Sequence, residues 1–337
     1  MSAARLGSPD AERAAGPVAP GSASAEVREA TPLHRDVCVV SFDRSVPMRI
    51  TTTAYVDPDA PLLVGHYPGL PIFPGVCLIE CAHRSVLEAG RLLGLAPVLA
   101  GVRSARFLSP VLPGDEVTTE VGLAASDGLW TAKATASVGG RRVATVRLDY
   151  ALSGAEPAGL GPAGPAAPLE SEEGSALGRT AGPAEIARRL PHRHPILLVD
   201  RVLGISPGHS LRAVKAVTAS EPWFRPRHPA EVVDDRLPAS LLIESWCQAA
   251  CLLAVWDEPT PDVRAGQVLL FGSLAGVVLG APVRAGEVVE HRARLARTNG
   301  GVFVFEGSAA VAGRLVLWVE QALVALRPAA ALTGERG

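Results

Sequence analysis

Residues 65–76 read GHYPGLPIFPGV, and Glu80 follows His66 by fourteen positions. Three prolines and three glycines within eleven residues predict a rigid loop that leads directly into a helix. Such a loop would hold His66 in one place, while the unpaired backbone N–H groups at the start of the helix face the same space. Because donors of this kind stabilise a developing oxyanion, the stretch has the parts of a catalytic loop.

The helix that follows this loop, at residues 76–93, has a counterpart at residues 239–255. Each helix begins just after a proline, and each carries a glutamate near its start, Glu80 or Glu244. Both are apolar around most of their circumference, which predicts that a sheet encloses each of them. A later Pro-Val and Gly-acidic turn also occurs twice, at residues 110–117 and 282–288. The chain therefore contains a duplicated domain rather than a short repeat.

Alternating apolar and polar residues after each helix predict antiparallel strands. These strands are expected at residues 118–123, 129–138 and 142–152, and again at 288–295, 302–310 and 314–326. Two stretches dense in Ala, Gly, Pro and Ser predict a disordered lead-in and a linker. The predicted organisation is a lead-in at 1–30, a first repeat at 31–152, a linker at 153–183, a second repeat at 184–328 and a tail at 329–337.

The loop and helix of the first repeat closely resemble the active-site motif of the 3-hydroxyacyl-[acyl carrier protein] dehydratases of the FabA/FabZ kind, in which an acid follows the histidine by fourteen positions. Residues 105–107 and 110–115 are similar to a second block of that family. The second repeat resembles the family at residues 190–202, which read LPHRHPILLVDRV, and along its helix at residues 242–250. The resemblance covers nearly everything outside the lead-in and the linker.

This resemblance implies an α+β architecture, a double hot-dog in which two antiparallel sheets each wrap around a long central helix and form an internal pseudo-dimer. It also implies dehydration of (3R)-hydroxyacyl thioesters to trans-2-enoyl thioesters in fatty-acid or polyketide biosynthesis, with room for a double-bond isomerisation by the same imidazole. The substrate would arrive on the phosphopantetheine of an acyl carrier protein, and the reaction would need neither a metal nor an organic cofactor. The expected assembly is a monomeric pseudo-dimer or a dimer of these.

The resemblance further assigns roles to individual residues. His66 would remove the C2 proton of the substrate, and backbone N–H groups near Ile72 and Gly75 would bind the thioester carbonyl. Glu244, kept protonated by its apolar surroundings, would protonate the leaving hydroxyl. Arg103 and Arg106 are the candidates for docking the acidic carrier protein; the alternative is that they are ordinary exposed arginines on a strand.

The two repeats differ at the positions that the family uses. The second repeat keeps Glu244 and, four residues later, the family's glutamine, Gln248, but its loop lacks the glycines and offers only His228 near the histidine position. Because sites of this family combine a histidine from one unit with an acid from the other, we expect one working site per chain, with His66 facing Glu244 and Gln248. A second, altered site would combine His228 with Glu80.

Two further expectations concern residues outside that working site. Arg84 lies one turn after Glu80, where it would neutralise that carboxylate. The remaining histidines, His192 among them, fit no constellation in the sequence.

Composition narrows the function classes. A formal net charge of −2 gives no basic field that would favour nucleic acid. The five cysteines do not form a disulfide framework, and two pairs spaced four apart are expected as buried small apolar residues rather than metal ligands. No signal-peptide pattern precedes the first repeat, so we expect a cytoplasmic protein.

The sequence leaves two alternatives to consider: a membrane helix in one uncharged stretch, and two functions other than dehydration. Residues 265–283 are uncharged and long enough for a membrane helix, but their glycines and Pro282 favour two buried strands joined by a turn. The rival functions are a hot-dog acyl thioesterase and a non-catalytic acyl-binding subunit of another dehydratase.

Overall fold

The computed structural model describes residues 27–126, 128–152, 178–228, 231–257 and 266–328. Most of the expected lead-in and linker, and all of the tail, lie outside these residues. The last residues of the expected lead-in and of the expected linker are nevertheless structured. They contain β1 (Val27–Arg28) and β8 (Arg179–Ala181), respectively. β1 pairs in parallel with β11 (Val232–Val233), so the N-terminal end of the described chain attaches to the second repeat.

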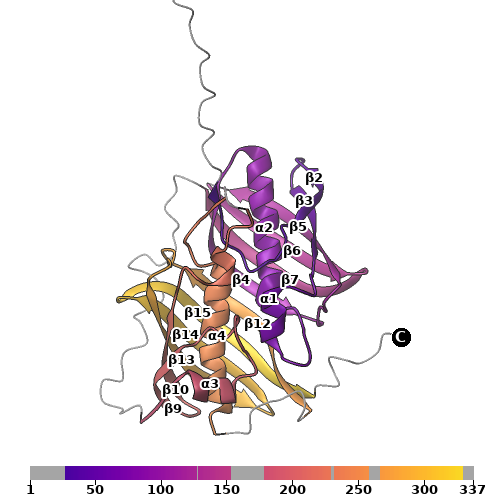
Figure 1. Cartoon of the computed structure of the whole chain (residues 1–337). Coiled ribbons are helices and arrows are strands. Elements are labelled where there is room, and N and C mark those ends of the chain that lie inside the picture. Colours follow the sequence, from indigo (N-terminus) through magenta and orange to yellow (C-terminus); the bar gives the residue numbers. More distant parts are fainter. Residues whose placement is uncertain (1–26, 127, 153–177, 229–230, 258–265, 329–337) are drawn as a thin grey trace, which may run out of the picture.

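The first repeat is a sheet wrapped around one long helix, α2 (Gly75–Leu93) (Figure 1). Pro74 precedes the helix with an extended backbone, and Gly94 ends it in the left-handed region at φ 69°, where its N–H reaches the carbonyls of Gly90 and Arg91. The other elements of this repeat are β2 (Cys38–Asp43), β3 (Met48–Tyr55), α1 (Pro61–His66), β4 (Pro97–Phe107), β5 (Glu116–Ser126), β6 (Leu129–Val138) and β7 (Arg141–Leu152).

The second repeat has the same plan around α4 (Ala239–Val255), which is buried along nearly its whole length. Its remaining elements are α3 (Pro183–Arg189), β9 (Arg201–Ser206), β10 (Ser210–Ala216), the short 3₁₀ helix η1 (Pro222–Phe224), β12 (Gln267–Leu279), β13 (Val288–Asn299), β14 (Val302–Val311) and β15 (Arg314–Pro328). The predicted helices and the six predicted strands are confirmed to within a few residues at each end.

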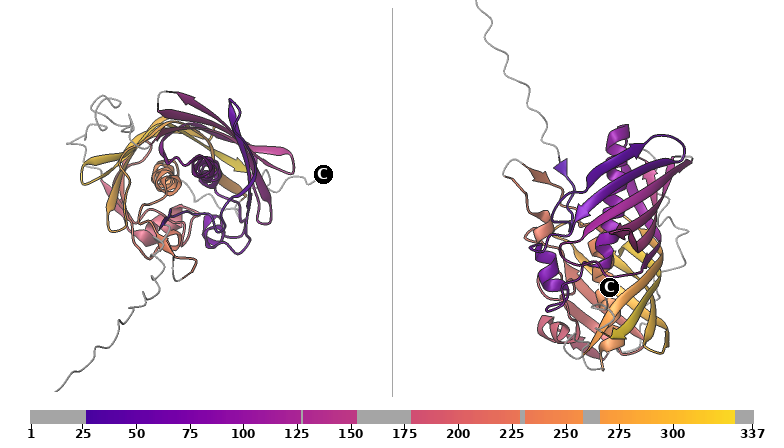
Figure 2. Two further views of the ribbon diagram at one scale, coloured as in Figure 1. Left: turned by 90° about the horizontal axis from the view of Figure 1, so that it is seen from above. Right: turned by 90° about the vertical axis from the view of Figure 1, so that its right-hand side faces the viewer.

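The sheets of the two repeats join into one. The strand order is β2-β3-β5-β6-β7-β4-β12-β15-β14-β13-β10-β9-β8, and the antiparallel pair β4–β12 forms the seam between the repeats. The curved sheet encloses α2 and α4, which contact each other at the centre of the molecule (Figure 2). The expected double hot-dog is confirmed, and the internal pseudo-dimer has a continuous sheet.

The uncharged stretch at residues 265–283 contains one strand, β12, so the expectation of two strands joined by a turn was wrong. The pairing of this strand with β15 shifts register between Phe271 and Ser273, and the strand takes a positive φ of 60° at Gly276, where a Cβ would lie 2.1 Å from the Glu320 carboxylate. The glycines therefore allow local irregularities within one long strand and do not end it. Among the described residues, no helix is both long and apolar enough to cross a membrane.

Candidate active site

The catalytic loop begins where α1 ends. His66 is the last residue of α1 and is 7% exposed, and its Nδ1 lies 2.9 Å from the carbonyl oxygen of Ile72. A carbonyl oxygen only accepts hydrogen bonds, so Nδ1 carries the proton and Nε2 is left with its lone pair. The prolines between these residues thus hold the imidazole in one tautomer and one orientation.

A second segment docks against this loop from the other repeat. The N–H of Arg193 donates to the carbonyl of Gly65 over 2.7 Å. A Cβ on Gly65 would lie 2.4 Å from the Arg193 carbonyl oxygen, so only glycine allows this approach. The docking carries His192 to His66, and their ring centroids lie 5.3 Å apart.

Glu244 reaches the same place from the second turn of α4. It is 3% exposed, and the Nε2 of His192 lies 3.4 Å from its Oε1. The side-chain amide of Gln248, one turn further on, donates to that oxygen over 2.8 Å. Gln248 is held in turn by the carbonyl of Ile196 and the N–H of Leu198, each at 2.8 Å. Burial of a carboxylate requires such partners, and both come from the second repeat.

The structure therefore brings His66 of the first repeat together with Glu244 and Gln248 of the second. The donor atoms of His66, His192 and Glu244 all lie within 4.8 Å of one another, and no other group of this kind occurs among the described residues. Ligands of a tetrahedral zinc ion would be only about 3.3 Å apart. The separation of His192 from Glu244, 3.4 Å, is close to that value, and all three side chains lie near enough to exchange protons with a substrate placed between them.

Electrostatics set the protonation of these groups. Burial, reinforced by the neighbouring His192, lowers the pKa of His66 to about 4, so its imidazole is neutral at neutral pH. Burial acts to raise the pKa of Glu244, but the contact and electrostatic interaction with His192, with smaller contributions from His66 and Gln248, outweigh burial and leave that pKa below its ordinary value. The expectation of a carboxyl kept protonated by apolar walls was therefore wrong, because two polar partners line those walls.

A cavity of about 360 Å³ opens beside these side chains. It is largely apolar and is lined by both repeats, including Phe73 and Phe107 from the first and Cys251 and Leu323 from the second. Gly75, at the first turn of α2, lies on its wall, and its backbone N–H has no hydrogen-bond partner among the described residues. Ile72 contributes its side chain to the wall and its carbonyl to His66.

Comparison with known proteins places this geometry in a family. A 3-hydroxyacyl-[acyl-carrier-protein] dehydratase FabZ of Albidiferax ferrireducens is 41% identical over 138 residues, which cover 40% of this chain and 88% of that protein. A FabZ of Granulibacter bethesdensis is 36% identical over 172 residues, which cover 50% of this chain and 96% of that protein. The chain belongs to the FabZ family of dehydratases. It is accordingly a hydro-lyase.

Each repeat also matches a family model of its own. Residues 43–140 match the ApeI dehydratase family and residues 190–320 match the FabA-like domain, so His66 and Glu244 fall in different matches. The fold is also that of the dehydratase domain of PpsC from Mycobacterium tuberculosis, with a TM-score of 0.58 at 16% identity over 86% of this chain and 98% of that one. The dehydratase domain from the CurJ module of curacin polyketide synthase gives a TM-score of 0.57 at 15% identity over 90% of this chain and 99% of that one.

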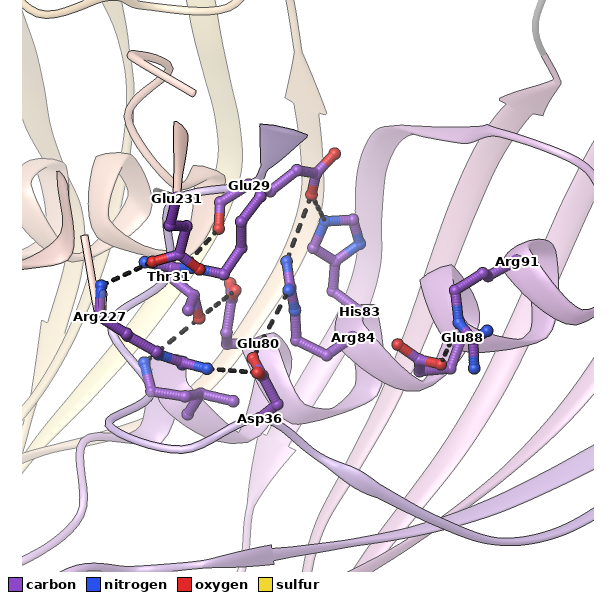
Figure 3. A network of polar contacts seen from close by, with 12 residues as sticks. Glu29, Thr31, Asp36, Glu80, His83, Arg84, Glu88, Arg91, Arg227 and Glu231 are labelled. Carbon is purple, nitrogen blue, oxygen red and sulfur yellow. Dashed lines mark hydrogen bonds and ion pairs between the residues drawn. The ribbon is translucent and has the colours of Figure 1, made fainter. Parts of the chain in front are cut away.

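The pseudo-symmetric counterpart of Glu244 is Glu80, whose carboxylate is bound by hydroxyl groups of the protein. Glu80 is 2% exposed, and one of its oxygens accepts a hydrogen bond from the hydroxyl of Thr31 over 2.8 Å (Figure 3). Its other oxygen accepts one from the hydroxyl of Ser240 over 2.7 Å. It lines a second cavity, of about 200 Å³, to which His228 does not contribute. The pairing of His228 with Glu80 is therefore not formed, because the exposed loop of His228 packs elsewhere.

The charges around Glu80 also differ from expectation. Arg84 contacts Glu29 and Asp36 instead of Glu80, so the expected i,i+4 neutralisation was wrong. In the loop of His228, Arg227 pairs with Asp36 of the N-terminal segment. Asp36 thus pairs with an arginine of each repeat, Arg84 and Arg227, beside the position that corresponds to the His66 loop of the first site.

The two arginines proposed for carrier docking are in different states. Arg103 makes two hydrogen bonds to Asp149 on the neighbouring strand, at 2.9 and 3.1 Å, which neutralise much of its charge. Arg106 is exposed, and its side chain has no hydrogen bond or ion pair with any described residue. It precedes Phe107, which lines the active-site cavity.

His192 is the site residue that sequence reasoning missed. Its signal was present, because it stands in the stretch 190–202 that resembles the family. Nothing in the linear sequence, however, shows that this stretch returns to the loop of the first repeat. That contact depends on the close approach of Arg193 to Gly65.

Proposed function

We propose that this dehydratase acts on (3R)-hydroxyacyl thioesters at one site per chain, with His66 as the base and Glu244 facing the leaving hydroxyl. The observation that carries the proposal is the meeting of these two buried side chains, from different repeats, at one apolar cavity. The pseudo-symmetric position supports it, because Glu80 has both oxygens occupied and no imidazole from the second repeat beside it.

The first step needs a neutral base and a sink for negative charge. The lone pair of His66 Nε2 takes the C2 proton, which the thioester carbonyl makes acidic. The charge that develops on the carbonyl oxygen is stabilised by the N–H of Gly75 and by the positive end of α2. The hydroxyl at C3 then leaves beside Glu244 as water. No metal or organic cofactor enters these steps.

The cavity and the surface beside it suit a carried substrate. An apolar cavity at the seam accepts an acyl chain, and we propose that the chain is presented on the phosphopantetheine arm of an acyl carrier protein. Arg106 is the better docking candidate of the two arginines, because no acidic side chain in the described part of the chain pairs with it. The same His66 can also remove a proton from C4 of the enoyl product and so isomerise the double bond.

A substrate series tests the function. The purified chain is incubated with a 3-hydroxyacyl thioester on carrier protein or on free pantetheine, and the products are identified by mass spectrometry. We expect loss of water, with no free thiol; release of thiol would indicate a thioesterase, and no reaction would indicate a binding subunit. Arg106→Glu should raise KM for the carrier-bound form only, with Arg188→Glu as a surface control.

The protonation of His66 predicts the acid limit of the reaction. A base must be unprotonated, and burial holds the pKa of His66 at about 4 instead of 6.5. The value of kcat/KM should therefore hold as pH falls through 6.5 and decline only as pH approaches about 4. Initial rates between pH 4 and 8, corrected for the folded fraction measured by circular dichroism at each pH, check this, and a limb near 6.5 in the folded enzyme would contradict it.

A further inference from the structure

The proposed reaction needs a proton donor for the leaving hydroxyl, and that donor has not yet been assigned. His66 accepts the C2 proton, and the leaving hydroxyl needs a proton to depart as water. Glu244 faces that hydroxyl but is an acceptor in its contacts: both Gln248 and His192 direct nitrogen atoms at its Oε1. The pKa of Glu244 also lies below its ordinary value, because its contacts outweigh burial, so the resting carboxylate has no proton of its own to give.

His192 is built into the site as firmly as His66. It is 5% exposed, and it stands in a tight turn in which the Arg193 side chain donates to the carbonyls of Leu190 and His192 over 2.8 and 2.7 Å. Arg193 also anchors this turn to Gly65. Because its backbone is held on both sides, the ring has a defined place between Glu244 and the cavity.

The two nitrogens of His192 have different surroundings. Nε2 lies 3.4 Å from Glu244, whereas Nδ1 is buried and has no hydrogen-bond partner among the described residues. Burial of an unpaired ring nitrogen costs free energy, and at His192 the side of the ring away from Glu244 is left without a competing partner. The titratable groups that face the ring are Glu244 and Cys251 of α4 and His66 and Tyr67 of the first repeat.

We propose that His192 holds the proton that Glu244 passes to the leaving hydroxyl. This inference rests on the proposed function. The C2–H bond breaks and its proton joins His66, the electron pair forms the C2=C3 bond, and the C3–O bond breaks. The hydroxyl takes a proton from Glu244, which takes one from His192, so that water departs. The proton on His66 then returns to His192 by way of Glu244, and the site is restored.

Substitution of His192 tests this role. His192→Asn retains an amide N–H that can contact Glu244 but cannot carry a mobile proton. It should lose about 100-fold in kcat or more, with KM changed less than about threefold. His192→Gly should lose as much, and added imidazole should restore part of its rate. The matched control is His194→Asn, an exposed side chain in the same turn that should keep the wild-type rate.

Near wild-type kcat in His192→Asn would overturn the inference and leave His192 a purely structural contact. Failure of imidazole to restore any rate to a folded His192→Gly, with folding checked by circular dichroism, would also overturn it. His66→Ala separates the two levels. Continued dehydration by His66→Ala would refute the proposed function, whereas its loss together with an active His192→Asn would refute only the role of His192.

Discussion

Glu244→Gln is expected to lose about 10²–10⁴-fold in kcat, whereas Glu80→Gln stays within about threefold of the wild type. The two glutamates occupy equivalent places in the two repeats and are equally buried, so burial alone predicts no difference. Their neighbours differ. Glu244 faces His66, His192 and the larger cavity, while both oxygens of Glu80 are bound by hydroxyls.

The glutamine replacements are matched in shape and separate chemistry from packing. At position 80 a glutamine accepts one hydrogen bond and donates another, and the hydroxyls of Thr31 and Ser240 can each reverse roles. Steady-state rates with one acyl thioester, and thermal melting of both variants, provide the measurement. The composite site is rejected if Glu80→Gln is the inactive variant and Glu244→Gln remains active.

Acid should unfold this protein more steeply than surface charge alone predicts. Burial lowers the pKa of His66 and of His83 to about 4 and that of His291 to about 3. Their unfolded value is about 6.5. Below pH 6.5 these histidines are protonated in the unfolded chain but remain neutral in the folded chain. The free energy of unfolding therefore has its full value above about pH 6.5 and falls as pH falls towards 4.

The expected size of this effect is large. At pH 5, each of the three histidines costs about 2 kcal/mol of stability relative to neutral pH, about 6 kcal/mol together, which is comparable with the whole stability of many domains. Urea unfolding at pH 7.5 and at pH 5.0, followed by circular dichroism, measures it. A midpoint that does not change between these pH values would contradict the prediction.

His291 offers the cleanest variant for this test. It is fully buried, and its Nε2 shares a hydrogen bond of 2.7 Å with the hydroxyl of Ser245, away from the proposed chemistry. His291→Gln should reduce the difference between the two pH values by about a third. The surface variant His209→Gln should leave it unchanged, because that side chain is hydrated in both the folded and the unfolded chain.

The duplicated motifs allowed most of the fold to be predicted. The second helix was placed at its observed bounds, because a proline before it and the apolar circumference define it locally. The error at residues 265–283 has a tertiary cause. β12 pairs with β4 on one side and β15 on the other, and this pairing holds the chain extended through glycines that predict a turn when read alone.

The candidate site was predicted in part. The partnership of His66 with Glu244 and Gln248 followed from the loss of matching features in the other pair, and the structure brings these three residues together. The expected pairing of Arg84 with Glu80 was wrong. Glu29 and Asp36, which precede the helix in the chain, lie close to Arg84 and bind its guanidinium instead.

The sequence by itself determined the local features of the site. These are a histidine in a proline-rich loop, a glutamate near the start of a helix, and the duplication of the helix, and each depends on neighbours a few positions apart. Which groups meet across the seam was decided by tertiary packing. The approach of Arg193 to Gly65 depends on a missing side chain and brings the segment of His192 against the His66 loop, while Gln248 and Ser245 hold the same segment on α4. Protonation followed from that packing, because a carboxyl takes its charge state from its partners in space and not from its position in the chain.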